Sequence, residues 1–289
     1  MLLVGAKIRE IIREYDYAQK IDINFKDKMY AANMGFFKSV NQDFGKSCYD
    51  KRGTNNFIRI NCENIKKSYL KAFELGYGSD INRYIEKEIA EDISKVLSRG
   101  NSEIKEVVKF CIVEVVRNIY NHSNSRDLWY SGQFWPSENM VEIAILDEGD
   151  GIYNTLKNNK RIIVNNPEEA LKFSLVPGVS RNSATMKNKE VDDNSGFGLY
   201  MIKSICDVAG SFTLISSGKC LNIENGKQEI WGVDFSGTAI RVRIKTSKLN
   251  DIKVCNLIKS LSREGTSKVK KLSRFDRISI DKVSELEVI

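Results

Sequence analysis

The chain has 289 residues, 42% of them hydrophobic and 29% charged, which is enough apolar material for one large domain or two ordinary ones. Three prolines and 19 glycines exclude collagen-like and proline-rich architectures. No run of about 18 apolar residues marks a membrane-spanning helix. The short apolar start, residues 1–6, is followed at once by charged side chains, unlike a secretory signal. We therefore expect a soluble cytoplasmic protein.

Charge distribution and cysteine spacing bear on two classes of site, a strongly basic surface and a zinc site. The net charge of +7 arises from acidic and basic residues that are interspersed along most of the chain. The six cysteines form no C-x-x-C pair, and His122 is the single histidine, so the ligand set of a zinc site is lacking. We expect reduced thiols, and any phosphoacceptor role of a histidine falls on His122.

Residue patterns predict mixed α/β structure in the first hundred residues. They indicate a helix at 7–17, strands at 20–25 and 57–60, and helices near 64–75 and 80–97. Gly100 marks a break, and Ser102 is suited to cap the next helix. We place domain boundaries here and near residue 248, giving an N-terminal α/β region (1–100), a second domain (101–248) and a C-terminal extension (249–289).

The second domain is predicted to combine two long helices with several strands. Helices are expected at 103–121 and 196–208, with a polar loop at 177–195 before the second. Strands are expected at 128–134, 140–146, 212–216, 220–223, 228–235 and 238–245. Periodicity after residue 246 is weak, and no function can be assigned to that tail.

The first of these helices carries a polar row. At about 100° per residue, Glu114, Asn118 and His122 fall in one narrow line beside the apolar stripe. A carboxylate and a carboxamide at the edge of a buried face cost free energy unless hydrogen bonds or a ligand satisfy them. For this helix alone, a polar rim is the simpler interpretation.

Three further segments are weak signals when taken singly. Asp147-Glu148-Gly149-Asp150-Gly151-Ile152 follows a strand, and its alternate glycines allow a sharp turn against a flat ligand, although a simple turn explains it too. Asn194-Ser195-Gly196-Phe197-Gly198-Leu199 opens a helix, where backbone N–H groups and the helix dipole attract phosphate. Gly237-Thr238 enters the last strand.

Taken in order, the four segments resemble the motif series of the GHKL ATPases. This family groups gyrase-type topoisomerase subunits, ninety-kilodalton heat-shock chaperones, histidine kinases and MutL-like repair proteins. The resemblance covers roughly residues 102–246, about half of the chain. It implies a Bergerat fold: a two-layer α/β sandwich with a mixed, largely antiparallel sheet, here preceded by a smaller α/β region. ATP and Mg²⁺ are the implied cofactors.

The resemblance also implies roles for individual residues. Glu114 would act on the attacking water, and Asn118 would hold Mg²⁺. Asp147 would bind the adenine amino group with support from Thr238. The remaining positions would line the base pocket or end the lid and face the phosphates: Gly149, Gly151, Ile152, Gly196, Gly198 and Leu199. His122 lies at a position that varies in the family.

Charged residues of the polar loop offer a further expectation. Arg181, Lys187 and Lys189 could reach phosphate oxygens, although solvated loop charges are the simpler explanation. Other nucleotide motifs are not supported. Val40 stands where a P-loop ending in Gly45-Lys46-Ser47 requires glycine, and Met201 interrupts a dinucleotide fingerprint.

The N-terminal region is weakly similar to the STAS-like segments that precede some stand-alone bacterial GHKL proteins. The similarity rests on Asn33-Met34-Gly35-Phe36-Phe37 and the flanking short strands. Such a module would bind other proteins. A structural extension that packs against the ATPase core is an equal alternative.

Three functions stay open from the sequence. The chain resembles a slow ATP-hydrolysing switch, a kinase that acts in trans on a protein (histidine-kinase or anti-sigma-factor type), or an ATP-sensing scaffold without catalysis. A protein partner is expected in each, and a homodimer is compatible with all three. A nucleic-acid role is disfavoured, because the clearest basic cluster lies in the tail: Lys268, Lys270, Lys271 and Arg274.

Overall fold

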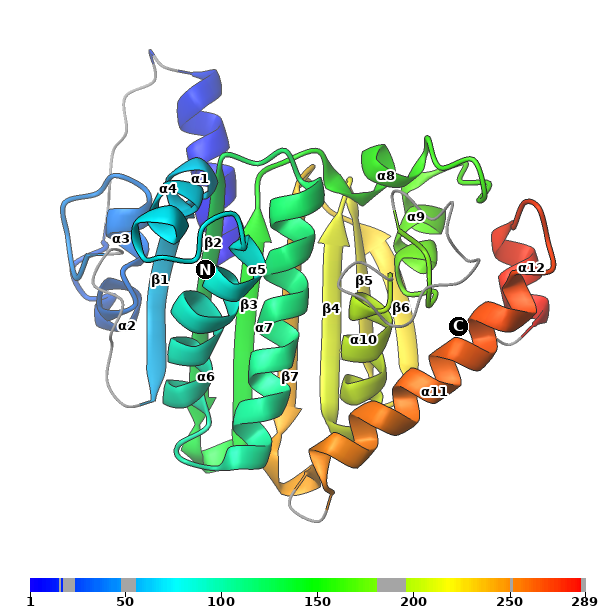
Figure 1. The fold of residues 1–289 in the computed structure, drawn as a ribbon. Coiled ribbons are helices and arrows are strands. Elements are labelled where there is room, and N and C mark those ends of the chain that lie inside the picture. The colour runs from blue at the N-terminus through cyan, green and yellow to red at the C-terminus, as the bar shows by residue number, and fades with distance from the viewer. Residues whose placement is uncertain (16, 18–23, 48–55, 181–195, 250–251, 287–289) are drawn as a thin grey trace.

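A seven-stranded open sheet forms the centre of the computed structural model, which describes residues 1–15, 17, 24–47, 56–180, 196–249 and 252–286. Its order is β1-β2-β3-β7-β4-β5-β6, and every pairing between these described strands is antiparallel (Figure 1). The strands are β1 (Phe57–Asn64), β2 (Asp127–Trp135), β3 (Met140–Asp147), β4 (Gly210–Ser216), β5 (Lys219–Glu224), β6 (Lys227–Gly232) and β7 (Thr238–Lys245).

Helices pack against this sheet or against one another. They are α1 (Leu2–Glu14), α2 (Met29–Asn33), α3 (Phe36–Ser39), α4 (Ile65–Glu74), α5 (Ile81–Tyr84), the π-helical η1 (Ile85–Ala90), α6 (Glu91–Leu97), α7 (Ser102–His122), α8 (Gly151–Leu156), α9 (Pro167–Ser174), α10 (Gly198–Ala209), α11 (Val254–Leu272) and α12 (Ile280–Glu285). Two short 3-10 segments are η2 (Pro136–Glu138) and η3 (Thr246–Lys248). Asn101 caps α7 by accepting a hydrogen bond from Ile104 N, which corrects the expectation for Ser102.

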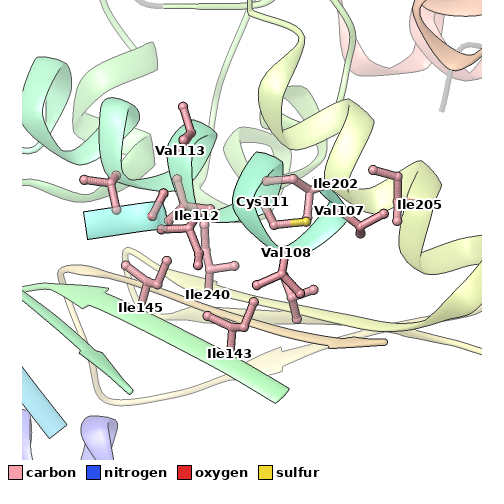
Figure 2. Packing of buried hydrophobic residues seen from close by; sticks show 14 of the residues in the cluster. Val107, Val108, Cys111, Ile112, Val113, Ile143, Ile145, Ile202, Ile205 and Ile240 are labelled. Atoms are coloured by element: carbon pink, nitrogen blue, oxygen red, sulfur yellow. The ribbon is translucent and has the colours of Figure 1, made fainter. Parts of the chain in front are cut away.

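The main core lies between the sheet and the helices that cover one of its faces. Val108 and Ile112 of α7 point at the strands, toward Ile143 of β3 and Ile240 of β7 (Figure 2). Ile202 of α10 packs in the same cluster. The three- and four-residue spacing of apolar residues on α7 therefore buries one stripe of the helix against the sheet.

The opposite face of the sheet carries a smaller core under α1. Leu2 and Ala6 of α1 cluster with Trp129 of β2 and Leu146 of β3. Alternate residues of a strand point to opposite faces, so β2 and β3 contribute to both cores. The sheet is thus covered on both sides near β2 and β3.

Most predicted elements agree with the structure, and the differences lie at the ends and in unassigned segments. The helix expected at 7–17 begins at Leu2, and the strand expected at 228–235 ends at Gly232. Helices α8, α9, α11 and α12 were not expected. The strand predicted at 20–25 and the loop residues 181–195 lie wholly or mostly outside the described residues. The sheet was expected to be mixed and largely antiparallel, and its described pairings are all antiparallel.

Residues on the two sides of the expected boundary at residue 100 share one core. Ile58 of β1 and Leu97 of α6 belong to the same buried cluster as Ile112 of α7. β1 also pairs with β2, so the end of the first hundred residues extends the central sheet. The segment that carries the STAS-like similarity lies in α2 and α3. Within the described part of the chain, no helix is both long and apolar enough to cross a membrane.

Candidate functional site

A cavity of about 250 Å³ lies among α7, α10 and the ends of the central strands. Its walls come from segments more than one hundred residues apart in the chain. Ten of the predicted site residues line it: Glu114, Asn118, His122, Asp147, Gly151, Ile152, Gly196, Gly198, Leu199 and Thr238. The four sequence segments singled out above therefore meet at one place.

Gly149 is the predicted site residue that does not line this cavity. Its N–H donates a hydrogen bond to Asp147 Oδ1 at 2.9 Å. A Cβ at this position would lie 2.0 Å from the carbonyl oxygen of Ser123, at the end of α7. In the structure, glycine is needed at this position because the loop packs directly on the backbone that follows α7.

The polar floor of the cavity lies at the ends of β3 and β7, and the end of β4 supports it from the side. Asp147 of β3 is in register with Thr238 of β7, which is in register with Ser216 of β4. Ser216 Oγ donates to Gly237 O at 2.9 Å and accepts from Ile152 N at 2.9 Å. The hydroxyl thereby ties the first turn of α8 to the strand ends. Sequence reasoning missed Ser216, since a serine at the end of a predicted strand gives no distinguishing signal.

Asp147 has an unusual electrostatic environment. The residue is only 1% exposed. Burial raises the pKa of its carboxyl to about 7, because the charged form loses its hydration, while the Gly149 N–H acts in the opposite direction. The nearby charges of Asp150 and Glu148 raise the pKa further. A ligand N–H directed at this carboxylate would favour its charged form.

The polar row of α7 forms one side wall. Glu114, Asn118 and His122 are spaced by about 6 Å along the helix axis, at 1.5 Å per residue. Glu114 is paired with Arg117 at 3.3 Å, and both side chains are largely buried. A Cβ at Gly198 would lie 2.5 Å from Glu114 Oε2, so the first residue of α10 contacts this carboxylate closely.

The N-terminus of α10 opens toward the same cavity. Its first intrahelical bond runs from Met201 N to Phe197 O, and no described side chain caps the helix. The N–H groups before Met201 therefore have no partner within the helix and form the positive end of its dipole. Gly196 has φ +72°, and its carbonyl oxygen accepts a hydrogen bond from Gly178 N. A Cβ at this position would lie 2.6 Å from Val179 O.

The cavity has further walls that the sequence did not indicate. Thr155, Ser174 and Val179 contribute from α8, α9 and the segment after α9. Ile258 and Ser262 contribute from α11. Their position in the cavity wall could not be predicted, because it depends on how these segments pack in the fold and not on their local sequence.

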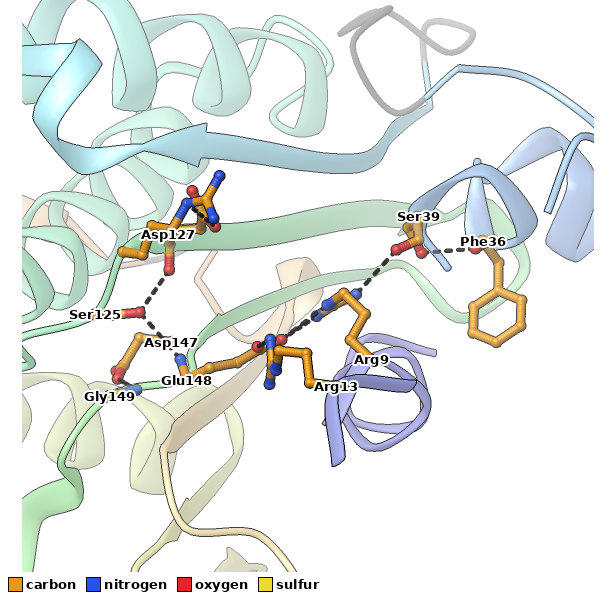
Figure 3. Close-up of polar contacts among 10 residues, drawn as sticks. Arg9, Arg13, Phe36, Ser39, Ser125, Asp127, Asp147, Glu148 and Gly149 are labelled. Carbon is orange, nitrogen blue, oxygen red and sulfur yellow. Dashed lines mark hydrogen bonds and ion pairs between the residues drawn. The ribbon is translucent and has the colours of Figure 1, made fainter. Parts of the chain in front are cut away.

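An ion-pair network from α1 holds the residue that follows Asp147. Arg9 donates to Glu148 Oε1 from Nε at 2.8 Å and from a terminal nitrogen at 2.6 Å. Arg13 donates to the other carboxylate oxygen at 2.7 Å (Figure 3). The Arg9 guanidinium also lies 3.6 Å from the ring centroid of Trp129. α1 therefore fixes the start of the glycine-rich turn from the opposite face of the sheet.

A cation in this cavity would draw on few protein ligands. The described part of the chain contains no cluster of three or more His, Cys, Asp or Glu side chains suited to a metal ion. Asn118 offers a carboxamide oxygen, a ligand type that Mg²⁺ accepts together with phosphate oxygens and water. The loop cations Arg181, Lys187 and Lys189 lie outside the described residues.

Comparison with known proteins gives no family assignment. The chain matches no protein-family model, and no curated protein is significantly similar to it.

Proposed function

We propose that this chain is a Mg²⁺-dependent ATP-binding protein of the GHKL type, with a Bergerat fold, and that it hydrolyses ATP slowly as a conformational switch acting on a protein partner. The observation that carries the proposal is the convergence of α7, the end of β3, the start of β7 and the start of α10 on one cavity. The meeting of four separate segments, in the family's order of motifs, supports a shared ligand.

The geometry supports a division of roles along the cavity. Asp147 and Thr238 lie side by side on the floor, where a buried carboxylate would accept the amino group of adenine. The uncapped first turn of α10 offers N–H groups to phosphates. Asn118 would hold Mg²⁺ with its carboxamide oxygen. When bound, the ion would neutralise part of the charge on the phosphates.

Glu114 suits the role of general base for an attacking water. It lies one helical turn from Asn118 on the same wall and contacts the start of α10. Its pairing with Arg117 keeps the carboxylate in place at the edge of the buried face. Such a group can orient a water molecule and take its proton as phosphate is transferred.

Isothermal titration with ATP and Mg²⁺ tests the binding step. We expect Asn118→Ala to weaken Mg²⁺-dependent binding at least tenfold, because the carboxamide ligand is removed. Asn121→Ala is the matched control, since Asn121 is exposed on the same helix and does not line the cavity. Equal affinity of the two variants, or no binding of ATP by the parent chain, would contradict the proposal.

Phosphate release tests the hydrolytic step. Glu114→Ala should retain ATP binding and lose turnover, whereas Glu106→Ala, an exposed change on the same helix, should keep both. If phosphate release from Glu114→Ala equals that of the parent, Glu114 is not the general base. Tight ATP binding without turnover in the parent would replace the switch by an ATP-sensing scaffold.

A further inference from the structure

The C-terminal helix α11 supplies part of the cavity wall. Ile258 and Ser262 both line the cavity, and their spacing of four residues places them on one face of the helix. Leu261 and Gly265 are buried beside them. The face of α11 that carries these residues is therefore turned toward the site and toward α10.

The contact between α11 and α10 is unusually close. A Cβ at Gly265 would lie 2.6 Å from Cε1 of Phe197 and 2.9 Å from Cε1 of Tyr200. Both distances are shorter than packed carbon atoms allow, so only glycine fits without a shift of the rings. Phe197 itself lines the cavity and directly precedes the first residue of α10. Gly265 thus sets the position of the turn whose N–H groups face the site.

Both ends of α11 are anchored to other elements of the fold. At its start, Val254 N donates to Glu103 Oε2 of α7 at 2.8 Å. At its end, Leu272 is buried in a second cluster with Phe173 of α9 and with Val179, which lines the cavity.

The chain beyond α11 strengthens the second anchor. Ile163 N donates to Ile278 O, and Ile278 N donates to Arg161 O, each at 2.9 Å. Val283 of α12 is buried in the same cluster as Val179. The C-terminal segment is therefore held at the start of α7 and beside Val179, which lines the cavity.

We propose that α11 is a structural wall of the nucleotide site, with Ile258 and Ser262 in contact with the ligand and Gly265 as a positioning residue for the first turn of α10. This inference rests on the proposed ATP binding. Because α11 forms the site only while docked, ATP binding and docking of the C-terminal segment are coupled, and each favours the other by the same factor.

Substitution of Gly265 tests the coupling. Gly265→Leu should raise the dissociation constant for Mg²⁺·ATP at least tenfold, because the new side chain separates α11 from Phe197. Gly265→Ala should give a smaller loss. Ser267→Leu is the matched control on the exposed face of the same helix and should bind ATP within twofold of the parent. Leucine is a better helix former than glycine, so lost binding would not reflect a weakened helix.

Hydrogen exchange provides a readout that does not depend on a variant. In the parent chain, saturating Mg²⁺·ATP should slow amide exchange across residues 254–272 at least fivefold, and this protection should disappear in Gly265→Leu. A circular dichroism spectrum equal to that of the parent would show that Gly265→Leu is folded. If it is not, Ile258→Ala and Ser262→Ala replace it, with the same tenfold loss expected for the pair.

The outcomes separate this inference from the proposed function. ATP binding by the parent with unchanged affinity in the variants, or with no protection of residues 254–272, overturns the role of α11 and leaves the proposed function in place. Absence of ATP binding by the parent overturns both.

Discussion

Replacing Asp147 by asparagine should remove a pH dependence of stability that this one carboxyl creates. The side chain is 1% exposed, and its burial raises the pKa from the ordinary value of 3.8 to about 7. Between these two values the folded chain retains a proton that the unfolded chain has released. The free energy of unfolding therefore falls as the pH rises through this interval, and it levels off above about pH 7.

The structure sets an upper limit on the effect. The difference between the two pKa values corresponds to about 4 kcal/mol at roughly 1.4 kcal/mol per pH unit. Asp147→Asn keeps the shape and the acceptor oxygen for Gly149 N but cannot ionise. The free energy of unfolding of the parent should fall by up to about 4 kcal/mol between pH 4 and pH 7, and this fall should be absent in the variant.

Urea unfolding followed by circular dichroism at pH 5, 6, 7 and 8 measures this directly. The parent and Asp147→Asn should diverge most at pH 7 and 8, with the variant more stable. Parallel pH profiles for the two chains would refute the assignment of a raised pKa to Asp147. In the parent, a ligand that donates to the carboxylate should also bind about tenfold more weakly at pH 6 than at pH 8, because less of the group is ionised.

Two further substitutions test the surroundings of the site by urea unfolding. Arg9→Ala should lower the free energy of unfolding by about 1–3 kcal/mol, because the part-buried pair with Glu148 and the contact with Trp129 are lost together. Arg13→Ala, at a 59% exposed side chain, should lower it by less than about 1 kcal/mol. Equal losses for the two variants would contradict this reasoning. Gly151→Ala should destabilise more than Gly226→Ala, although both have φ near +73°, since only at 151 would a Cβ lie 2.5 Å from Ser217 Oγ and Ser236 O.

The elements with strong local periodicity could be predicted from the sequence. α7 has nine buried residues that form an apolar stripe of helical period, and β7 alternates between the main core and the opposite face. Both were therefore placed to within a residue or two. The polar row of α7, Glu114, Asn118 and His122, follows from the same helical periodicity. Its meeting with Asp147 and Thr238 was expected only through the family resemblance, because strand register is not encoded in any one segment.

The role of α11 could not be predicted for a physical reason. Its buried residues include Gly265, which packs by the absence of a side chain and therefore gives no hydrophobic signal. Many of the remaining positions are lysine, serine and arginine, which look alike on a solvated helix and on a tail. The close packing of Gly265 depends on the rings of Phe197 and Tyr200, some sixty residues earlier in the chain. Local pattern cannot reveal such a partner.

The strand made last among those described occupies the middle of the sheet. β7 lies between β3 and β4, so both of these strands expose unpaired backbone edges until residue 245 has been synthesised. During translation the nascent protein therefore passes through a stage in which the sheet is in two parts, each with an unpaired edge strand. Chaperones can bind these edges, and the edges can also pair wrongly with other strands. β7 completes the sheet and the cavity floor together, and a chain that stops before β7 can have neither.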